Sequence, residues 1–210
     1  MEAPGMKDLI SKWGVTDCSR LVDWREALRP LTVDIVGDFA GEELFAIHGE
    51  ALLLHCIRTA RVDYGHGFQL LHAVHAIESF LSKLRDRGCN FHIIWFDGYE
   101  HLCIPHDVPE EQSYMYLLTR AVILQHLPDI NYRFKSLGDT KFRRYLNETS
   151  LHFIMCCDGG PKHLDMVTDN TLDHLSIGFR FAAVGISVAF IDDVEFRSSK
   201  VCQVVISALY

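Results

Sequence analysis

The stretch that best indicates the fold is Phe91-His92-Ile93-Ile94-Trp95-Phe96, which is followed directly by Asp97 and Gly98. It is almost entirely apolar, as expected for a strand of a parallel sheet that is covered on both faces. Before it, residues 68–87 carry apolar side chains at the spacing of an amphipathic helix, and Gly88 ends that helix. A long helix that leads into a buried strand predicts an α/β fold.

The same alternation continues on both sides of this segment. Strands are expected at 44–47, 91–96, 132–134, 151–157 and 186–191, and a last apolar segment covers 201–209. Helices are expected directly after Gly49 and over 68–87, 113–127, 140–147 and 172–184. The pattern predicts a three-layer α/β domain over 41–210, with a mostly parallel central sheet and helices on both faces.

Residues 1–40 are predicted to form an N-terminal helical extension that packs on this domain. Asp17 can cap a helix that runs to Pro30, and a second short amphipathic turn is expected around Val33. Nothing near Met1 resembles a signal peptide, and the longest apolar stretches, such as 181–191, are too short to cross a membrane.

Charge and cysteine usage narrow the setting of the protein. The chain of 210 residues has a formal net charge of −8, so any contact with nucleic acid has to come from a local basic patch. The seven cysteines form no C-x-x-C pair, and Cys156 and Cys157 lie in an expected buried strand. Cysteines used as small core residues are typical of a reducing compartment, which predicts a cytoplasmic or nuclear protein.

Acidic residues follow the ends of most of the expected strands. The set consists of Glu50, Asp97, Asp158 and Asp192, with Glu78 on the long helix as a further candidate. Carboxylates gathered at one sheet edge would repel each other, and Mg²⁺ or Mn²⁺ would relieve this repulsion and activate a water for phosphodiester hydrolysis. Taken singly, each acid is better explained as ordinary turn or cap chemistry, and it is the repetition at successive strand ends that favours a site.

Several short motifs carry a resemblance to known proteins. The Phe96-Asp97-Gly98 turn is similar to the F-D-G turn of flap-nuclease relatives in the PIN-like nuclease superfamily. The runs 33–41, 67–75, 89–93 and 194–197 resemble the N-terminal PIN-like region of fungal antiviral DExD/H-box helicases of the superkiller-like group. The resemblance implies RNA as the partner or substrate and a helicase core in cis or in trans. The chain itself contains no G-x-x-x-x-G-K-[ST] loop and no DExD/H box.

One position departs from the PIN pattern. His48 stands where the family carries its first strand-end acid, and an imidazole suits Zn²⁺ or Mn²⁺ better than Mg²⁺. The expected metal ligands are therefore His48, Glu50, Asp97, Asp158 and Asp192. The same departure supports an alternative, in which the fold is catalytically degenerate and binds RNA or a protein as a scaffold.

The least supported reading is a site for a small phosphorylated ligand near Gly159-Gly160, because the G-x-G-x-x-G spacing is absent.

The densest basic stretch is the candidate nucleic-acid surface. It comprises Arg133, Lys135, Lys141, Arg143 and Arg144, with aromatic residues between them. Such a mixture suits single-stranded RNA, by phosphate pairing and base stacking, although an ordinary exposed helix face would give the same pattern.

The long helix can present three polar side chains, His72, His75 and Glu78, on one face. A polar helix edge explains them better than a metal site.

Overall fold

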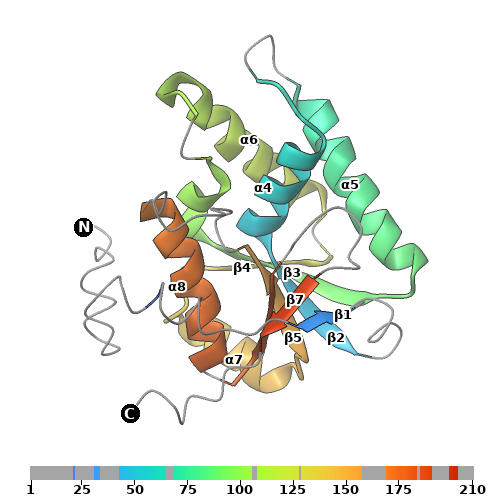
Figure 1. Ribbon diagram of the computed structural model, residues 1–210, viewed down its shortest axis with the longest axis vertical. Helices are drawn as coiled ribbons and strands as arrows, with labels where there is room; N and C mark the ends of the chain where they lie inside the picture. The colour runs from blue at the N-terminus through green and yellow to red at the C-terminus, as the bar shows by residue number, and fades with distance from the viewer. Residues whose placement is uncertain are drawn as a thin grey trace.

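A sheet in the order β1-β7-β6-β5-β2-β3-β4 forms the centre of the computed structural model (Figure 1). The structure describes residues 21, 31–33, 43–64, 69–105, 108–127, 129–157, 169–183, 185–190 and 199–202. The strands are β1 (Leu31–Val33), β2 (Leu44–His48), β3 (Asn90–Phe96), β4 (Asn131–Phe134), β5 (Phe153–Cys156), β6 (Ser187–Phe190) and β7 (Ser199–Cys202).

The strands from β6 to β4 are all parallel. His48 at the end of β2 is in register with Ile94 of β3, and Phe96 at the end of β3 is in register with Phe134 of β4. Only β7 and β1 run antiparallel to their neighbours. The carboxyl ends of β2 and β3 therefore meet at one edge of the sheet, where α/β folds place their sites. The predicted α/β class with a mostly parallel sheet is confirmed.

Helices cover both faces of this sheet (Figure 1). One face carries α4 (Gly49–Thr59), α5 (Leu70–Asp86) and α6 (Glu110–His126), and the other carries α7 (Thr140–Glu148) and α8 (Asp169–Ala183). The alternation of side chains along β3 explains why it is apolar throughout: Ile93 and Trp95 pack in the first core, and Ile94 and Phe96 pack in the second.

Two local features set the borders of α5 and of the next turn. Gly88 follows α5 with a φ of 79°, a left-handed conformation that glycine adopts at low cost, and the chain then enters β3. At the other end of β3, the chain turns at once into the 3₁₀ segment η1 (Asp97–Cys103), so that Asp97 is fixed at the sheet edge.

Some element borders differ from the prediction. Helix α6 begins at Glu110 rather than at 113, because Pro109 precedes it in an extended conformation and its missing N–H is no loss at a helix start. The amphipathic turn expected around Val33, Val36 and Phe39 is wrong at Val33, since Leu31–Val33 pairs with β7 as a strand, and Val36 and Phe39 lie outside the described residues. Leu21 is helical and buried. Asp17 and the rest of the expected N-terminal helix lie outside the described residues.

No helix in the described ranges is both long enough and apolar enough to cross a bilayer.

Candidate functional site

The junction of β2 and α4 positions the first two side chains of the site. His48 is the last residue of β2, Gly49 begins α4, and Glu50 lies in the first turn of that helix. Gly49 lies so close to Trp95 that a Cβ atom there would be 2.2 Å from Cδ2 of the indole. The absence of a side chain at residue 49 therefore lets the start of α4 rest on β3, and both His48 and Glu50 are buried as a result.

Arg120 of α6 is the counter-charge of Glu50. Its Nε donates a hydrogen bond of 2.9 Å to Oε1 of Glu50, and its Nη2 lies 2.9 Å from the same oxygen. The Arg120 guanidinium also lies over the Trp95 ring, with Cζ 5.4 Å from the ring centroid. Since the Arg120 side chain is only 5% exposed and Glu50 is not exposed, this is an interior ion pair with little screening by solvent.

Asp97 is joined to the same guanidinium from the end of β3. Its Oδ1 accepts a hydrogen bond of 2.7 Å from Nε of Arg133, and Nη2 of Arg120 lies 3.5 Å away. Glu100, in the same 3₁₀ segment, makes only a long contact of 3.8 Å with Nη1 of Arg120. Two of the predicted acids, Glu50 and Asp97, are thus brought together with Arg120 between them.

Burial dominates the protonation of His48 and Glu50. It lowers the pKa of His48 to about 3, helped by the nearby His174 and Arg120, so the imidazole is neutral. Burial raises the pKa of Glu50 to about 7, although the charge and hydrogen bonds of Arg120 act in the opposite direction. His48 Nε2 lies 3.3 Å from Glu50 Oε2, and neither atom has a hydrogen-bond partner among the described residues.

The other predicted acids are not part of this cluster as far as the structure describes them. Glu78 is half-exposed on α5, where its Oε1 lies 2.7 Å from Nε2 of His126 on α6. Asp158 and Asp192 lie outside the described residues, as do Gly159 and Gly160. Whether either aspartate approaches Glu50 and Asp97 stays a prediction.

Among the expected metal ligands that the structure describes, the acids Glu50 and Asp97 are paired with arginine rather than left open to a metal ion. Oε1 of Glu50 and Oδ1 of Asp97 already face guanidinium groups, and a metal bridging them would have to displace the buried Arg120. In the described parts of the chain, no three His, Cys, Asp or Glu side chains are grouped so that they could hold a metal ion. The positive charge at this sheet edge is supplied by an arginine of the protein itself.

Arg120 was not predicted from the sequence as a site residue, although a signal for it exists. Tyr116, Arg120 and Ile123 follow the spacing of one helix face, and Tyr116 and Ile123 are core residues. A charged residue on an apolar helix stripe has to meet an opposite charge inside the fold. What the sequence could not show was which of the acids at the strand ends would be its partner.

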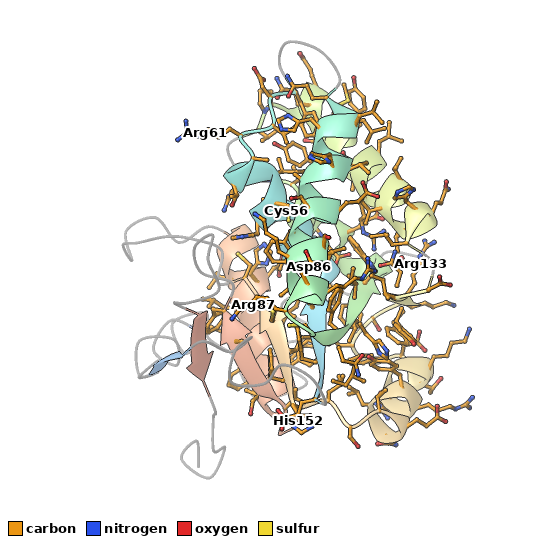
Figure 2. All side chains as sticks on the ribbon, turned by 90° about the vertical axis from the view of Figure 1, so that its right-hand side faces the viewer. Cys56, Arg61, Asp86, Arg87, Arg133 and His152 are labelled. Carbon is orange, nitrogen blue, oxygen red and sulfur yellow. The ribbon has the colours of Figure 1, made fainter. Side chains whose placement is uncertain are left out.

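One arginine of the predicted basic stretch is bound to an acidic side chain, and the other four cations are exposed to solvent. Arg133, on the edge strand β4, is bound to Asp97 and lies on the side of the molecule away from β1 and β7 (Figure 2). The other four are exposed and form no salt bridge with the described residues: Lys135, Lys141, Arg143 and Arg144. Phe134, Phe142 and Tyr145 are buried against one another, so these rings are unavailable for base stacking.

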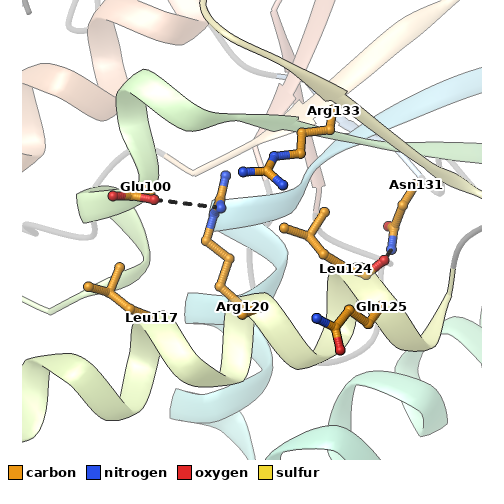
Figure 3. A pocket seen from close by; sticks show the side chains of 8 residues that line it. Glu100, Leu117, Arg120, Leu124, Gln125, Asn131 and Arg133 are labelled. Carbon is orange, nitrogen blue, oxygen red and sulfur yellow. Dashed lines mark hydrogen bonds and ion pairs between the residues drawn. The ribbon is translucent and has the colours of Figure 1, made fainter.

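A cavity of about 450 Å³ lies next to the Arg120 cluster, between η1, α6 and β4 (Figure 3). Its walls combine two arginines, three apolar side chains of α6 and a few uncharged or acidic polar groups. The lining residues are Glu100, Leu117, Arg120, Ala121, Leu124, Gln125, Asn131 and Arg133.

A parallel sheet that carries acidic residues just beyond the ends of β2 and β3 defines an α/β domain of the PIN-like class. The chain belongs to the family of PIN-like domains of the ATP-dependent RNA helicase DDX60, which matches residues 19–192. A human protein described as a probable ATP-dependent RNA helicase DDX60-like is 25% identical over 155 residues. That match covers 71% of this chain and 8% of the human protein. No solved structure matches the chain.

Proposed function

We propose that this PIN-like domain binds RNA without hydrolysing it, as a module of a DDX60-like helicase whose helicase core acts in cis or in trans. The observation that carries the non-hydrolytic part is the Arg120 guanidinium between Glu50 and Asp97. In a working two-metal nuclease, divalent cations neutralise the acids and activate water. Here a fixed side chain supplies the neutralising charge, and a guanidinium does not activate water.

The cost of removing Arg120 from its place supports this reading. A metal that displaced the guanidinium would take over the charge of Glu50 but would leave the buried Arg120 without its partner, and such a loss costs about 3–5 kcal/mol. The histidine at the end of β2 adds to the argument, because His48 is held neutral and contributes no negative charge. Both features favour the degenerate form of the fold over the metal-dependent ribonuclease.

The RNA-binding part rests on the exposed cations of α7 and on Lys135, which follows β4. Lys141, Arg143 and Arg144 project from α7, whose first turn is held by the Asp139 cap, and Lys135 precedes that cap. In a chain with a net charge of −8, such a cluster is the local basic patch that phosphate binding requires. Because the neighbouring rings are buried, phosphate pairing is its expected mode, with strong salt dependence and little sequence preference.

The test is a titration of labelled single-stranded RNA with the full chain at two salt concentrations. The variant Lys141→Ala/Arg143→Ala/Arg144→Ala should weaken binding and reduce its salt dependence. The matched control removes three other exposed cations near the opposite face of the sheet, as Arg58→Ala/Arg61→Ala/Lys83→Ala. Equal losses in both variants would indicate only a response to net charge and would contradict the assignment to α7.

Hydrolysis is tested on the same RNA with Mn²⁺, Mg²⁺ or a chelator. Intact RNA under all three conditions, with binding preserved, is the expected result. Cleavage that needs metal and disappears in Asp97→Asn/Asp158→Asn would instead establish the ribonuclease, the second candidate function. The buried His48 Nε2 and Glu50 Oε2 atoms, which have no hydrogen-bond partner in the described part of the chain, are the observation that favours that candidate.

A further inference from the structure

We infer that the cavity between η1, α6 and β4 binds the phosphate group of a nucleotide, with its base against α6. The site adjoins the Arg120 cluster, since Arg120 and Arg133 also contact Glu50 and Asp97, and its lining includes none of the exposed cations of α7. The same chemistry fits a free mononucleotide and the terminal nucleotide of an RNA. If the ligand is the end of an RNA, the inference rests on the RNA binding proposed above; if the ligand is a free mononucleotide, it does not.

The two arginines of the cavity still have hydrogen-bonding capacity. Arg120 uses Nε and Nη2 for Glu50, and its Nη1 makes only the 3.8 Å contact with Glu100. Arg133 uses Nε for Asp97, and its two terminal nitrogens have no partner among the described residues. Figure 3 shows both guanidinium groups directed toward the same space. Planar guanidinium groups match the geometry of a phosphate, which they bind through pairs of parallel hydrogen bonds.

The remaining walls suit a nucleoside. Leu117, Ala121 and Leu124 present an apolar strip of α6, and Gln125 contributes an exposed amide that can both donate and accept. A volume of about 450 Å³ lies within the range of small-molecule pockets, about 300–1,000 Å³. The hollow is open to solvent, and its combination of an apolar wall with convergent charged groups is one that ligand sites use.

The floor of the cavity is rigid. Asn131 accepts a hydrogen bond of 2.9 Å from Nε1 of Trp95 and donates one of 3.0 Å to the carbonyl of Ile123. These bonds tie β4 to β3 and to α6, and Asp97 fixes Arg133 from below. Arg120 is buried and held by Glu50, so little of its side-chain entropy is lost on binding, whereas Arg133 is 61% exposed and held at Nε alone.

Glu100 is the one carboxylate among the described residues that line the cavity, and it gives the inference its sharpest test. Its side chain is 53% exposed, and its contact with Arg120 is longer than a hydrogen bond, so it can turn to solvent. If the ligand is an anion, removing this negative charge has to strengthen binding. If the ligand were a cation, the same change would weaken it.

The experiment is a calorimetric titration of the full chain with AMP, adenosine and inorganic phosphate. AMP should bind saturably, and adenosine and inorganic phosphate should each bind at least about tenfold more weakly, since each lacks one half of the contacts. Arg133→Gln should weaken AMP binding about tenfold, and Glu100→Gln should strengthen it. Ala121→Trp fills the cavity without a change of charge and should abolish binding, while unchanged melting temperatures show that the variants fold.

The outcomes separate this inference from the proposed function. Absence of saturable AMP binding, equal affinity for AMP and inorganic phosphate, or weaker binding in Glu100→Gln would overturn it. RNA binding that depends on α7 would survive all three results, and loss of RNA binding with AMP binding intact would contradict only the proposed function. Two RNAs that differ only in a 5′-phosphate or a 5′-hydroxyl show whether the nucleotide comes from an RNA end or is free. Stronger binding of the 5′-phosphorylated RNA that is abolished by Ala121→Trp assigns the cavity to RNA termini. Equal binding of the two RNAs assigns it to free nucleotides.

Discussion

Arg120 and Glu50 are 70 positions apart in the chain, yet Nε of the arginine lies 2.9 Å from Oε1 of the glutamate in the interior of the protein. The pair links the start of α4 to the middle of α6, and Asp97 extends the link to the end of β3. In this way one guanidinium connects both acids that the structure brings to the sheet edge.

Removing one partner of the pair should destabilise the fold. Arg120→Met keeps an unbranched, apolar stem but removes the guanidinium, which leaves the buried Glu50 without its counter-charge, with an expected cost of about 3–5 kcal/mol in the free energy of unfolding. Urea denaturation measures this cost. In Arg120→Met/Glu50→Met no buried charge is left unpaired at this position, so the double variant should be more stable than the single one. Strictly additive losses would show that the two residues are not coupled.

The protonation of Glu50 should make stability depend on pH. Its pKa in the folded protein is raised from 4.5 to about 7, so between these values the folded state holds a proton that the unfolded state has lost. The stabilisation from this proton is therefore present below about pH 4.5 and is lost as the pH rises through 7. The free energy of unfolding of the wild type, measured relative to Glu50→Gln, should fall between pH 5 and pH 8.

His48 provides the internal control for this measurement, because its contribution has the opposite sign. Its pKa is lowered from 6.5 to about 3, so stability from the neutral imidazole is present above about pH 6.5 and is lost as the pH falls toward 3. The difference between the wild type and His48→Gln should therefore decrease on acidification. Two differences that change in the same direction would contradict the assigned pKa shifts.

The contact between Gly49 and Trp95 predicts a severe effect for a small substitution. In Gly49→Ala the new Cβ would lie 2.2 Å from the indole, so α4 or Trp95 has to move, and overpacking of this kind costs about 1–3 kcal/mol or more. Thermal unfolding gives the cost, and Trp fluorescence reports the displaced ring. Gly138→Ala is the matched control, since its Cβ would meet nothing closer than 3.7 Å. Similar melting temperatures for the two variants would contradict the close contact.

Metal ions should distinguish the wild type from a variant without the guanidinium. In the wild type, Mn²⁺ should leave the melting temperature unchanged, because Arg120 lies between Glu50 and Asp97. In Arg120→Ser the two carboxylates and His48 are left with open space, and Mn²⁺ should stabilise the variant by binding only the folded form. A matched rise in the wild type would show that metal binds despite Arg120, and it would revive the two-metal expectation.

The fold could be predicted from the sequence because the apolar residues of each helix and strand recur at the spacing typical of that element. The apolar run of β3 and the stripe of α5 are explained by two buried sheet faces and one buried helix face, and both were confirmed. Val33 could not be assigned correctly, since its strand exists only through pairing with β7, about 170 residues away. Short edge strands lack a pattern of their own and depend on a distant partner.

The site was predicted only in part, for a similar reason. Asp97 and Glu50 follow strand ends, and parallel strands had to bring them to one edge. The partner of these acids is set by the way α6 crosses above the sheet, which the periodicity of α6 does not specify. The basic stretch was predicted as a mixture of charges and rings, and only the three-dimensional packing separates exposed Lys141 and Arg143 from buried Phe142.

The positive charge at this sheet edge comes from a side chain, Arg120, and not from a bound ion. A metal ion can be stripped by a chelator, exchanged for another metal, or limited by supply, whereas Arg120 is synthesised with the chain. The contacts that join Glu50 and Asp97 through Arg120 are therefore part of the folded chain itself and need no ion to be supplied from outside.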